Sequence, residues 1–157
     1  MGNSLHGASK SAGLSRTDVE RFRDDGLIVA PVRLSAETNA LMRASLDRLL
    51  AFRDDVAPES LICPHIPALG RGRDDEAITL AAEWFVYATQ PEILDCVEAL
   101  IGPNIVLWGS QVFCKPARTG RKIPWHQDGK YWPMRPLATV SAWIAIDDAT
   151  PDRKSVV

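Results

Sequence analysis

The sequence lacks a basic surplus and a membrane-spanning run, and these absences exclude broad classes of function. Its 18 Lys and Arg residues are outnumbered by 20 Asp and Glu residues, for a formal net charge of −2. Binding to nucleic acid needs clustered basic side chains that neutralise phosphates, so we predict no nucleic-acid partner. No apolar run approaches the roughly 20 residues that cross a bilayer, and residues 1–16 lack the apolar core of a secretion signal. We therefore expect no membrane partner and a cytoplasmic location.

Cysteine is scarce, and its spacing argues against disulfide and zinc scaffolds. The three cysteines, Cys63, Cys96 and Cys114, are odd in number and form no Cys-x-x-Cys pair. A disulfide framework needs an even set, and a structural zinc site needs closely spaced pairs of thiols. We therefore predict reduced thiols in a cytosolic protein.

The first part of the chain has the pattern of helices. Apolar residues recur with helical spacing in several segments, and the pattern is weakest in the third of them. The predicted helices cover residues 17–25, 35–52, 76–89 and 91–101. Thr17 and Glu20 have the spacing of a capping box for the first helix, and Gly102-Pro103 ends the last one. The stretch 54–75 is rich in proline, glycine and charge, and it is predicted to be a long loop.

The later part of the chain has the composition of β-strands. β-Branched and aromatic residues, in places alternating with polar ones, indicate strands rather than helices. The predicted strands cover residues 27–32, 105–115, 123–128 and 137–146. Because helices come mostly first and strands mostly afterwards, we predict an α+β fold with an antiparallel sheet or barrel.

The segment Trp125-His126-Gln127-Asp128 carries the pattern with the most chemistry. Side chains two residues apart on a strand point to the same face, so His126 and Asp128 can reach one cation. An imidazole nitrogen and a carboxylate oxygen suit Fe(II), Mn(II) or Zn(II). A distant second histidine would complete a facial triad of two histidines and one carboxylate. The pair alone is also typical of an ordinary strand histidine followed by an aspartate that starts a turn.

The residues around this pair resemble the phytanoyl-CoA dioxygenase family of iron(II)- and 2-oxoglutarate-dependent oxygenases. The similar features after the pair are Tyr131-Trp132-Pro133, Arg135-Pro136, Ala142-Trp143 and the turn Asp147-Asp148-Ala149-Thr150. Before it, EALIGPNIVLWGSQVFCKP is similar to the helix and strand that precede the motif in the family. The resemblance covers about residues 17–152 and is strongest over 91–152.

This resemblance implies a particular fold and chemistry. The implied fold has N-terminal helices packed on an incomplete double-stranded β-helix, a barrel of the jelly-roll or cupin type. The implied enzyme is a dioxygenase that uses Fe(II), 2-oxoglutarate and O2 on a small-molecule substrate. Halogenating relatives have Ala or Gly in place of the carboxylate, so the presence of Asp128 favours hydroxylation.

The resemblance also implies roles for five residues. His126 and Asp128 match the two iron ligands of the motif and are therefore the expected catalytic residues. Trp143 and Gln111 match positions that face 2-oxoglutarate, and Gln127 matches a position near the mouth of the site, where substrate enters. Each of the last three has a simpler interpretation, because Trp143 is also typical of a core aromatic and the two glutamines of ordinary polar strand residues.

The resemblance stops at Asp152. In the family, later strands carry the second iron-binding histidine and an arginine that pairs with the far carboxylate of 2-oxoglutarate. We therefore expect a disordered leader over 1–16, a partial dioxygenase-like domain over 17–152 and a non-matching tail over 153–157, which together would make a truncated member. The alternative function is a catalytically inactive small-molecule-binding or regulatory module with the same fold. The sequence leaves the substrate and the oligomeric state open.

Overall fold

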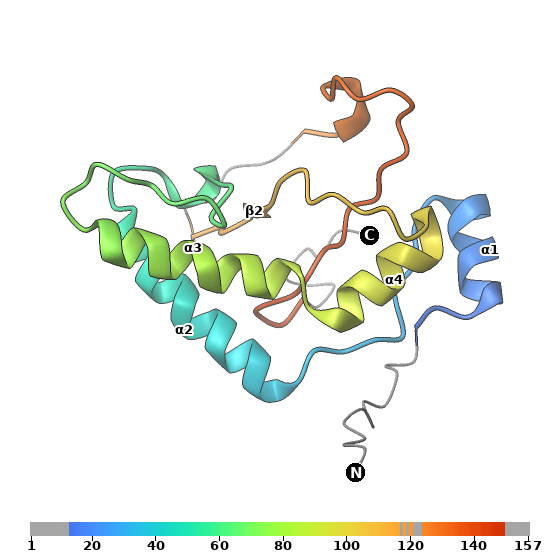
Figure 1. Ribbon diagram of the computed structural model, residues 1–157, viewed down its shortest axis with the longest axis horizontal. Coiled ribbons are helices and arrows are strands. Elements are labelled where there is room, and N and C mark those ends of the chain that lie inside the picture. The colour runs from blue at the N-terminus through green and yellow to red at the C-terminus, as the bar shows by residue number, and fades with distance from the viewer. Residues whose placement is uncertain (1–12, 117, 119, 121–123, 150–157) are drawn as a thin grey trace, which may run out of the picture.

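The computed structural model describes residues 13–116, 118, 120 and 124–149, and helices dominate this part of the chain. The helices are α1 (Arg16–Asp25), α2 (Ala36–Phe52), α3 (Asp74–Ala88) and α4 (Pro91–Ile101), with the short 3-10 helices η1 (Pro58–Ser60) and η2 (Asp128–Lys130). Strands β1 (Leu61–Ile62) and β2 (Gln111–Val112) pair antiparallel, with Leu61 opposite Val112. The predicted α+β class is confirmed. Figure 1 shows α2 and α3 side by side at one end of the molecule and α1 beside α4 at the other.

The hydrophobic core lies between α2 and α3. An apolar stripe on each helix packs against the other helix, and the two short strands contribute to the same core. Its buried side chains are Met42, Leu46, Leu49, Phe52, Leu61, Ala77, Leu80, Trp84, Tyr87 and Val112. Helix α3 is a regular helix of 15 residues, although its sequence pattern is weak. The reason is that its outer face also carries exposed apolar side chains, Ile78, Phe85 and Val86, which blur the stripe.

Local signals set the ends of the helices, with one correction. Helix α1 is capped by a box formed by Ser15 and Asp18, in which the Ser15 backbone N–H donates to the Asp18 carboxylate at 2.9 Å. The predicted box of Thr17 and Glu20 is therefore wrong, because Ser15 and Asp18 have the same spacing and Thr17 already lies inside the helix. Helices α2 and α4 begin and end close to the predicted residues.

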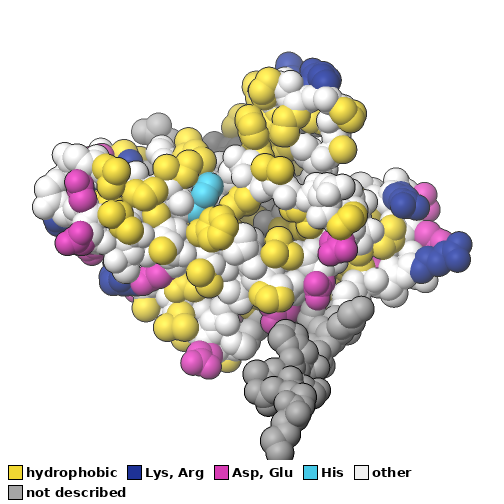
Figure 2. Space-filling model, viewed as in Figure 1, with side chains coloured by type: hydrophobic (Ala, Val, Ile, Leu, Met, Phe, Trp, Pro, Cys, Tyr) yellow, Lys and Arg dark blue, Asp and Glu magenta, His cyan; other side chains and the backbone are white. Residues whose placement is uncertain are grey.

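The predicted strands are mostly absent from the described residues. Of the strand predicted over 105–115, only β2 forms, and the described parts of 27–32, 123–128 and 137–146 contain no regular strand. A strand needs a hydrogen-bonded neighbour, and in the described part of the chain these segments have none. Several of their apolar side chains are exposed, with Val29 at 95% and Val106 at 84%, whereas Ile144 and Ile146 are partly buried against the core. Figure 2 shows apolar side chains spread over much of the visible face.

The prediction of a loop over 54–75 also needs correction, because η1 and β1 lie within it. No barrel is formed by the described residues, whose one sheet has two strands. The predicted leader and tail fall largely on residues 1–12 and 150–157, outside the described residues. Cys63, Cys96 and Cys114 are free, as predicted. In the described part of the chain, no helix has the length and apolar character that a bilayer span requires.

A polar network joins α2 to α3 at the edge of the core. The buried Ser45 hydroxyl donates to the Glu83 carboxylate at 2.7 Å, and the Arg48 guanidinium pairs with the same carboxylate. The hydrogen bond from Arg48 is the main reason that the pKa of Glu83 lies below its usual value of 4.5, and burial opposes this shift. The ionised form of Glu83 is therefore favoured by folding.

We expect Glu83→Gln to lower the free energy of unfolding by about 1 kcal/mol at neutral pH, and by much less near pH 3. Because the pKa of Glu83 is lowered in the folded protein, its contribution is present above the unfolded pKa and is lost as the pH falls through the folded pKa. Glutamine keeps an acceptor for Ser45, so the variant removes the charge alone. Urea unfolding at the two pH values measures the difference, and an equal loss at both would contradict this account.

Candidate functional site

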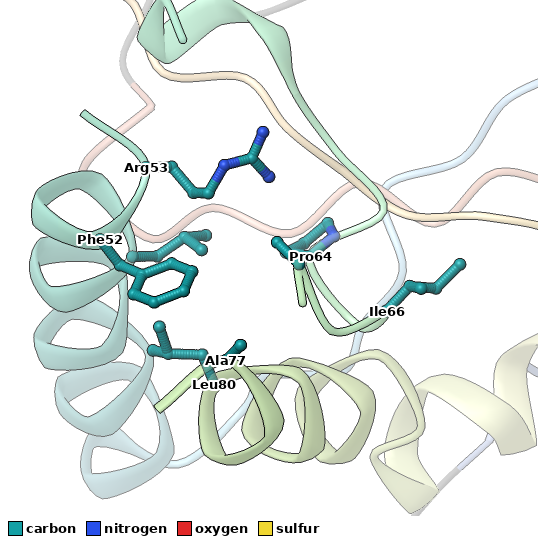
Figure 3. Close-up of a pocket in the computed structure, with 8 residues that line it drawn as sticks. Phe52, Arg53, Pro64, Ile66, Ala77 and Leu80 are labelled. Carbon is teal, nitrogen blue, oxygen red and sulfur yellow. The ribbon is translucent and has the colours of Figure 1, made fainter. Parts of the chain in front are cut away.

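Two cavities of very different size lie among the described residues and bear on function. The smaller lies between α2, α3 and the loop that carries Pro64 and Ile66 (Figure 3). Its volume is about 10 Å³, which is room for one water molecule at most. Phe52 and Leu80 line it from the two helices. It is a gap in the packing of the core and cannot hold a substrate.

The larger cavity lies where β2 meets the loop that carries η2 and has a volume of about 360 Å³. This volume falls in the range of small-molecule sites. Its lining residues are Glu59, Gln111, Phe113, Cys114, Lys115, His126, Asp128 and Trp132. Pairing of β1 with β2 brings η1 against the start of the segment 111–115. Figure 1 shows the loop that carries η2 projecting from the body of the molecule.

His126 and Asp128 meet at this cavity. The His126 Nε2 and Asp128 Oδ1 atoms are 3.0 Å apart, and about half of each side chain is exposed. Gln127 between them has extended backbone, with φ −115° and ψ 120°, and Asp128 then begins η2. Extended backbone at the middle residue places the two side chains on the same side of the chain, as the spacing predicts. The geometry arises without a paired strand.

The second nitrogen of His126 is also held. Its Nδ1 atom lies 2.8 Å from the Pro124 carbonyl oxygen, which can only accept a hydrogen bond. Nδ1 therefore carries a proton, and in the neutral ring the lone pair is on Nε2, the atom that faces Asp128. The Pro124 carbonyl is the main reason that the pKa of His126 lies above its usual value, and the Asp128 carboxylate adds to this. The raised pKa means that Nε2 holds its proton more firmly than the nitrogen of a free imidazole. A metal that binds Nε2 has to displace this proton.

This arrangement fits a divalent metal ion. In an octahedral site, two ligands at 90° to one another, each ~2.1 Å from the metal, are ~3.0 Å apart. The His126 Nε2 and Asp128 Oδ1 atoms are separated by the same distance, 3.0 Å. A hydrogen bond from the opposite ring nitrogen to a carbonyl is the support that metal-binding histidines usually have. Within the described residues, no group of three or more His, Cys, Asp and Glu side chains is gathered closely enough to hold a metal. The described chain thus offers two ligands.

The other predicted site residues are placed differently from one another. Gln111 lines the same cavity as His126 and Asp128. Gln127 is exposed and is not among the residues that line it. Trp143 is 57% exposed and also lies outside the lining. The segment around Trp143 is tied to α2, because Asn39 donates to the Ala145 carbonyl at 3.1 Å. The cofactor and substrate roles of these three residues stay predictions.

Sequence reasoning missed four charged or aromatic residues of the cavity, namely Glu59, Phe113, Lys115 and Trp132. Phe113 and Lys115 follow Gln111 at intervals of two, so their alternation in an extended segment was a usable signal. Trp132 lies in the loop that follows the His126 and Asp128 pair. Glu59 had no local signal, because only the pairing of β1 with β2 brings η1 to the cavity.

Comparison with known proteins gives a family match over most of the chain. Residues 22–154 match the family described as Phytanoyl-CoA dioxygenase. This range contains every residue that lines the cavity. No solved structure matches the chain.

Curated relatives are also similar to parts of this chain. Peroxisomal phytanoyl-CoA dioxygenase of Bos taurus is 44% identical over 69 residues, which cover 41% of this chain and 20% of the relative. The Mus musculus protein of the same name is 29% identical over 139 residues, or 80% of this chain and 40% of the relative. Ectoine dioxygenase of Stutzerimonas stutzeri is 30% identical over 147 residues, or 90% of this chain and 48% of the relative. The chain thus spans at most about half the length of these relatives.

Proposed function

The chain belongs to the phytanoyl-CoA dioxygenase family, and from this premise we propose that it carries the active site of an Fe(II)- and 2-oxoglutarate-dependent hydroxylase. The observation that supports this most directly is the His126 and Asp128 pair, whose Nε2 and Oδ1 atoms are 3.0 Å apart. The pair borders a cavity of about 360 Å³. A dioxygenase of the iron and 2-oxoglutarate type is the general activity that the family indicates.

In this proposal, each residue of the pair has a defined task. His126 holds the iron through Nε2 while the Pro124 carbonyl fixes the ring through Nδ1. Asp128 supplies the carboxylate ligand, which leaves no place for a halide ligand. When bound, iron and 2-oxoglutarate supply the oxidising chemistry, with O2 as the oxidant. Phe113 and Trp132 give the cavity apolar walls that exclude water from that chemistry. Gln111, which lines the cavity, would contact 2-oxoglutarate.

The expectations about the barrel, the substrate and the cellular location are part of the same proposal. We propose that the segments 27–32, 105–115 and 137–146 become strands of a jelly-roll barrel when they pair with further strands. Trp143 then faces 2-oxoglutarate, and Gln127 lies at the mouth of the site. The names of the relatives refer to phytanoyl-CoA and to ectoine, so the proposed substrate is a small organic molecule. A cytoplasmic setting remains part of the proposal, while one group of relatives is named as peroxisomal.

A catalytically inactive binding module is the second candidate, and one observation favours it. Among the described residues, only His126 and Asp128 are gathered as metal ligands. The other described histidine, His65, is engaged elsewhere, because its Nδ1 lies 2.6 Å from the Ser110 hydroxyl. A module of this kind would bind a small molecule in the cavity without turning it over.

Succinate release separates the two candidates. We expect the chain, supplied with Fe(II), O2 and 2-oxoglutarate, to form succinate slowly, because two protein ligands hold iron more weakly than three. Chromatographic detection of labelled succinate measures this, with the metal-free chain as the blank. Loss of the signal in Asp128→Ala, and its retention in Asp148→Ala, would support the hydroxylase. Binding of 2-oxoglutarate with no succinate at any iron concentration would instead support the inactive module.

A further inference from the structure

Gly129 follows Asp128 in η2 and has a close neighbour further along the loop. It is half-buried, whereas Asp128 and Lys130 on either side of it are exposed. A Cβ atom placed on Gly129 would lie 2.5 Å from the Cδ2 atom of Leu137 and 3.5 Å from its Cγ atom. Carbon atoms in favourable contact are ~3.5–4.0 Å apart. The leucine side chain therefore occupies the space that a side chain at position 129 would need.

The backbone of Gly129 does not itself demand glycine. The left-handed φ angles of the described glycines occur at other positions, so an alanine could adopt the backbone conformation found here. The turn is also held internally, because the Tyr131 N–H donates to the Asp128 carbonyl at 2.9 Å. An added methyl group would thus press η2 away from Leu137 as a unit.

Leu137 begins a segment that is attached to the body of the molecule. The loop that carries η2 projects from that body (Figure 1). Further along the segment, Ile144 and Ile146 are partly buried against the core, and Asn39 of α2 donates to the Ala145 carbonyl at 3.1 Å. The residue that packs against Gly129 therefore comes from a segment anchored on the core between α2 and α3.

We propose that Leu137 is a positioning residue for the His126 and Asp128 pair, because its contact with Gly129 fixes the orientation of η2. Asp128 is the first residue of η2, and its Oδ1 atom lies 3.0 Å from the His126 Nε2 atom. A tilt of the turn would change this distance. The inference rests on the proposed function, because a shared metal ion is the reason to keep the two side chains together. Supporting residues of this kind typically contribute about 10–100-fold to metal affinity.

The test exchanges the sizes of the two neighbouring side chains in the full chain. We expect Gly129→Ala to weaken Mn(II) binding by about tenfold, because the methyl group displaces η2. Leu137→Ala should also weaken binding, whereas Leu137→Met, with a similar volume, should retain it. The variant with both alanine substitutions should bind Mn(II) more tightly than Gly129→Ala alone, because the methyl group then has room. Leu69→Ala, at a leucine that is 61% exposed, is the control and should leave the affinity unchanged.

A second measurement needs no metal. The nuclear magnetic resonance signals of the His126 ring depend on the carboxylate beside it. In the metal-free chain at one fixed pH, we expect these signals to shift in Gly129→Ala and to return toward their original positions in the variant with both alanine substitutions. Urea unfolding should change little, because Gly129 and Leu137 lie outside the core. A lower unfolding midpoint with unmoved His126 signals would mean that the contact serves stability alone, and would overturn the inference.

The outcomes separate this inference from the proposed function. Unchanged Mn(II) affinity and unchanged His126 signals in Gly129→Ala overturn the inference, since Leu137 then simply turns away from the methyl group. A loss of affinity that the second alanine substitution does not reduce also contradicts it. If the unchanged protein binds no Mn(II), the proposed function fails, and the His126 signals of the metal-free variants still decide whether Leu137 positions the pair.

Discussion

Phe52→Ala is expected to lower the free energy of unfolding by about 3–5 kcal/mol, a large part of the total stability of a domain of this size. Phe52 is 2% exposed at the end of α2, where it packs against α3. The Arg73 guanidinium lies 4.7 Å from the centre of its ring and loses that contact as well. Chemical denaturation followed by circular dichroism measures the change.

A matched variant separates loss of volume from loss of the ring. Phe52→Leu keeps most of the buried apolar volume and should cost clearly less than the alanine variant. Leu41→Ala, on the exposed side of α2 at 55% exposure, should change stability by less than about 1 kcal/mol. An equal effect of the buried and exposed substitutions would mean that the core does not lie between α2 and α3.

The second large effect is expected on metal affinity. His126→Ala and Asp128→Ala should each weaken Mn(II) binding by at least about a hundredfold, because one of the two described ligands is removed and a single ligand holds the ion poorly. Calorimetric titration measures the affinity for Mn(II). A pH near 8 is used because few protons then compete with the metal for His126. Neither substitution should alter the helical circular dichroism signal, because both side chains are roughly half exposed and outside the core.

His65→Ala is the control for this prediction. His65 is the other histidine among the described residues, and it lies against Ser110 rather than in the larger cavity. Its removal should leave the affinity for Mn(II) unchanged. If His65→Ala weakened binding as much as His126→Ala, the metal would be held by a different set of ligands.

Local patterns predict the helices and the metal pair, and non-local contacts explain what the sequence did not reveal. The helix over 35–52 and the juxtaposition of His126 with Asp128 depend on residues a few positions apart, so spacing alone indicates them. Strands depend on partners far away in the chain, and the segment 137–146 has the alternation of a strand without a hydrogen-bonded neighbour among the described residues. The composition of a segment indicates its tendency to form a strand, but it does not show whether a second strand is present to pair with it.

The cavity shows the same division between local and non-local information. Gln111, Phe113 and Lys115 share a face because they alternate along one segment, which a sequence reveals. Glu59 reaches them through pairing of Ile62 with Gln111, which are 49 positions apart by their numbers. No residue close to Glu59 in the sequence indicates that its side chain lies at the cavity. The full set of residues that line the cavity therefore required the structure.

The position of the bound metal tests the central claim most directly. The chain has three histidines, His6, His65 and His126, and their ring signals can be followed by nuclear magnetic resonance while Mn(II) is added in small amounts. The account predicts that the ring signals of His126 broaden first and that those of His65 stay sharp. Selective broadening of His65, or equal broadening of all three rings, would contradict a metal site built on His126 and Asp128.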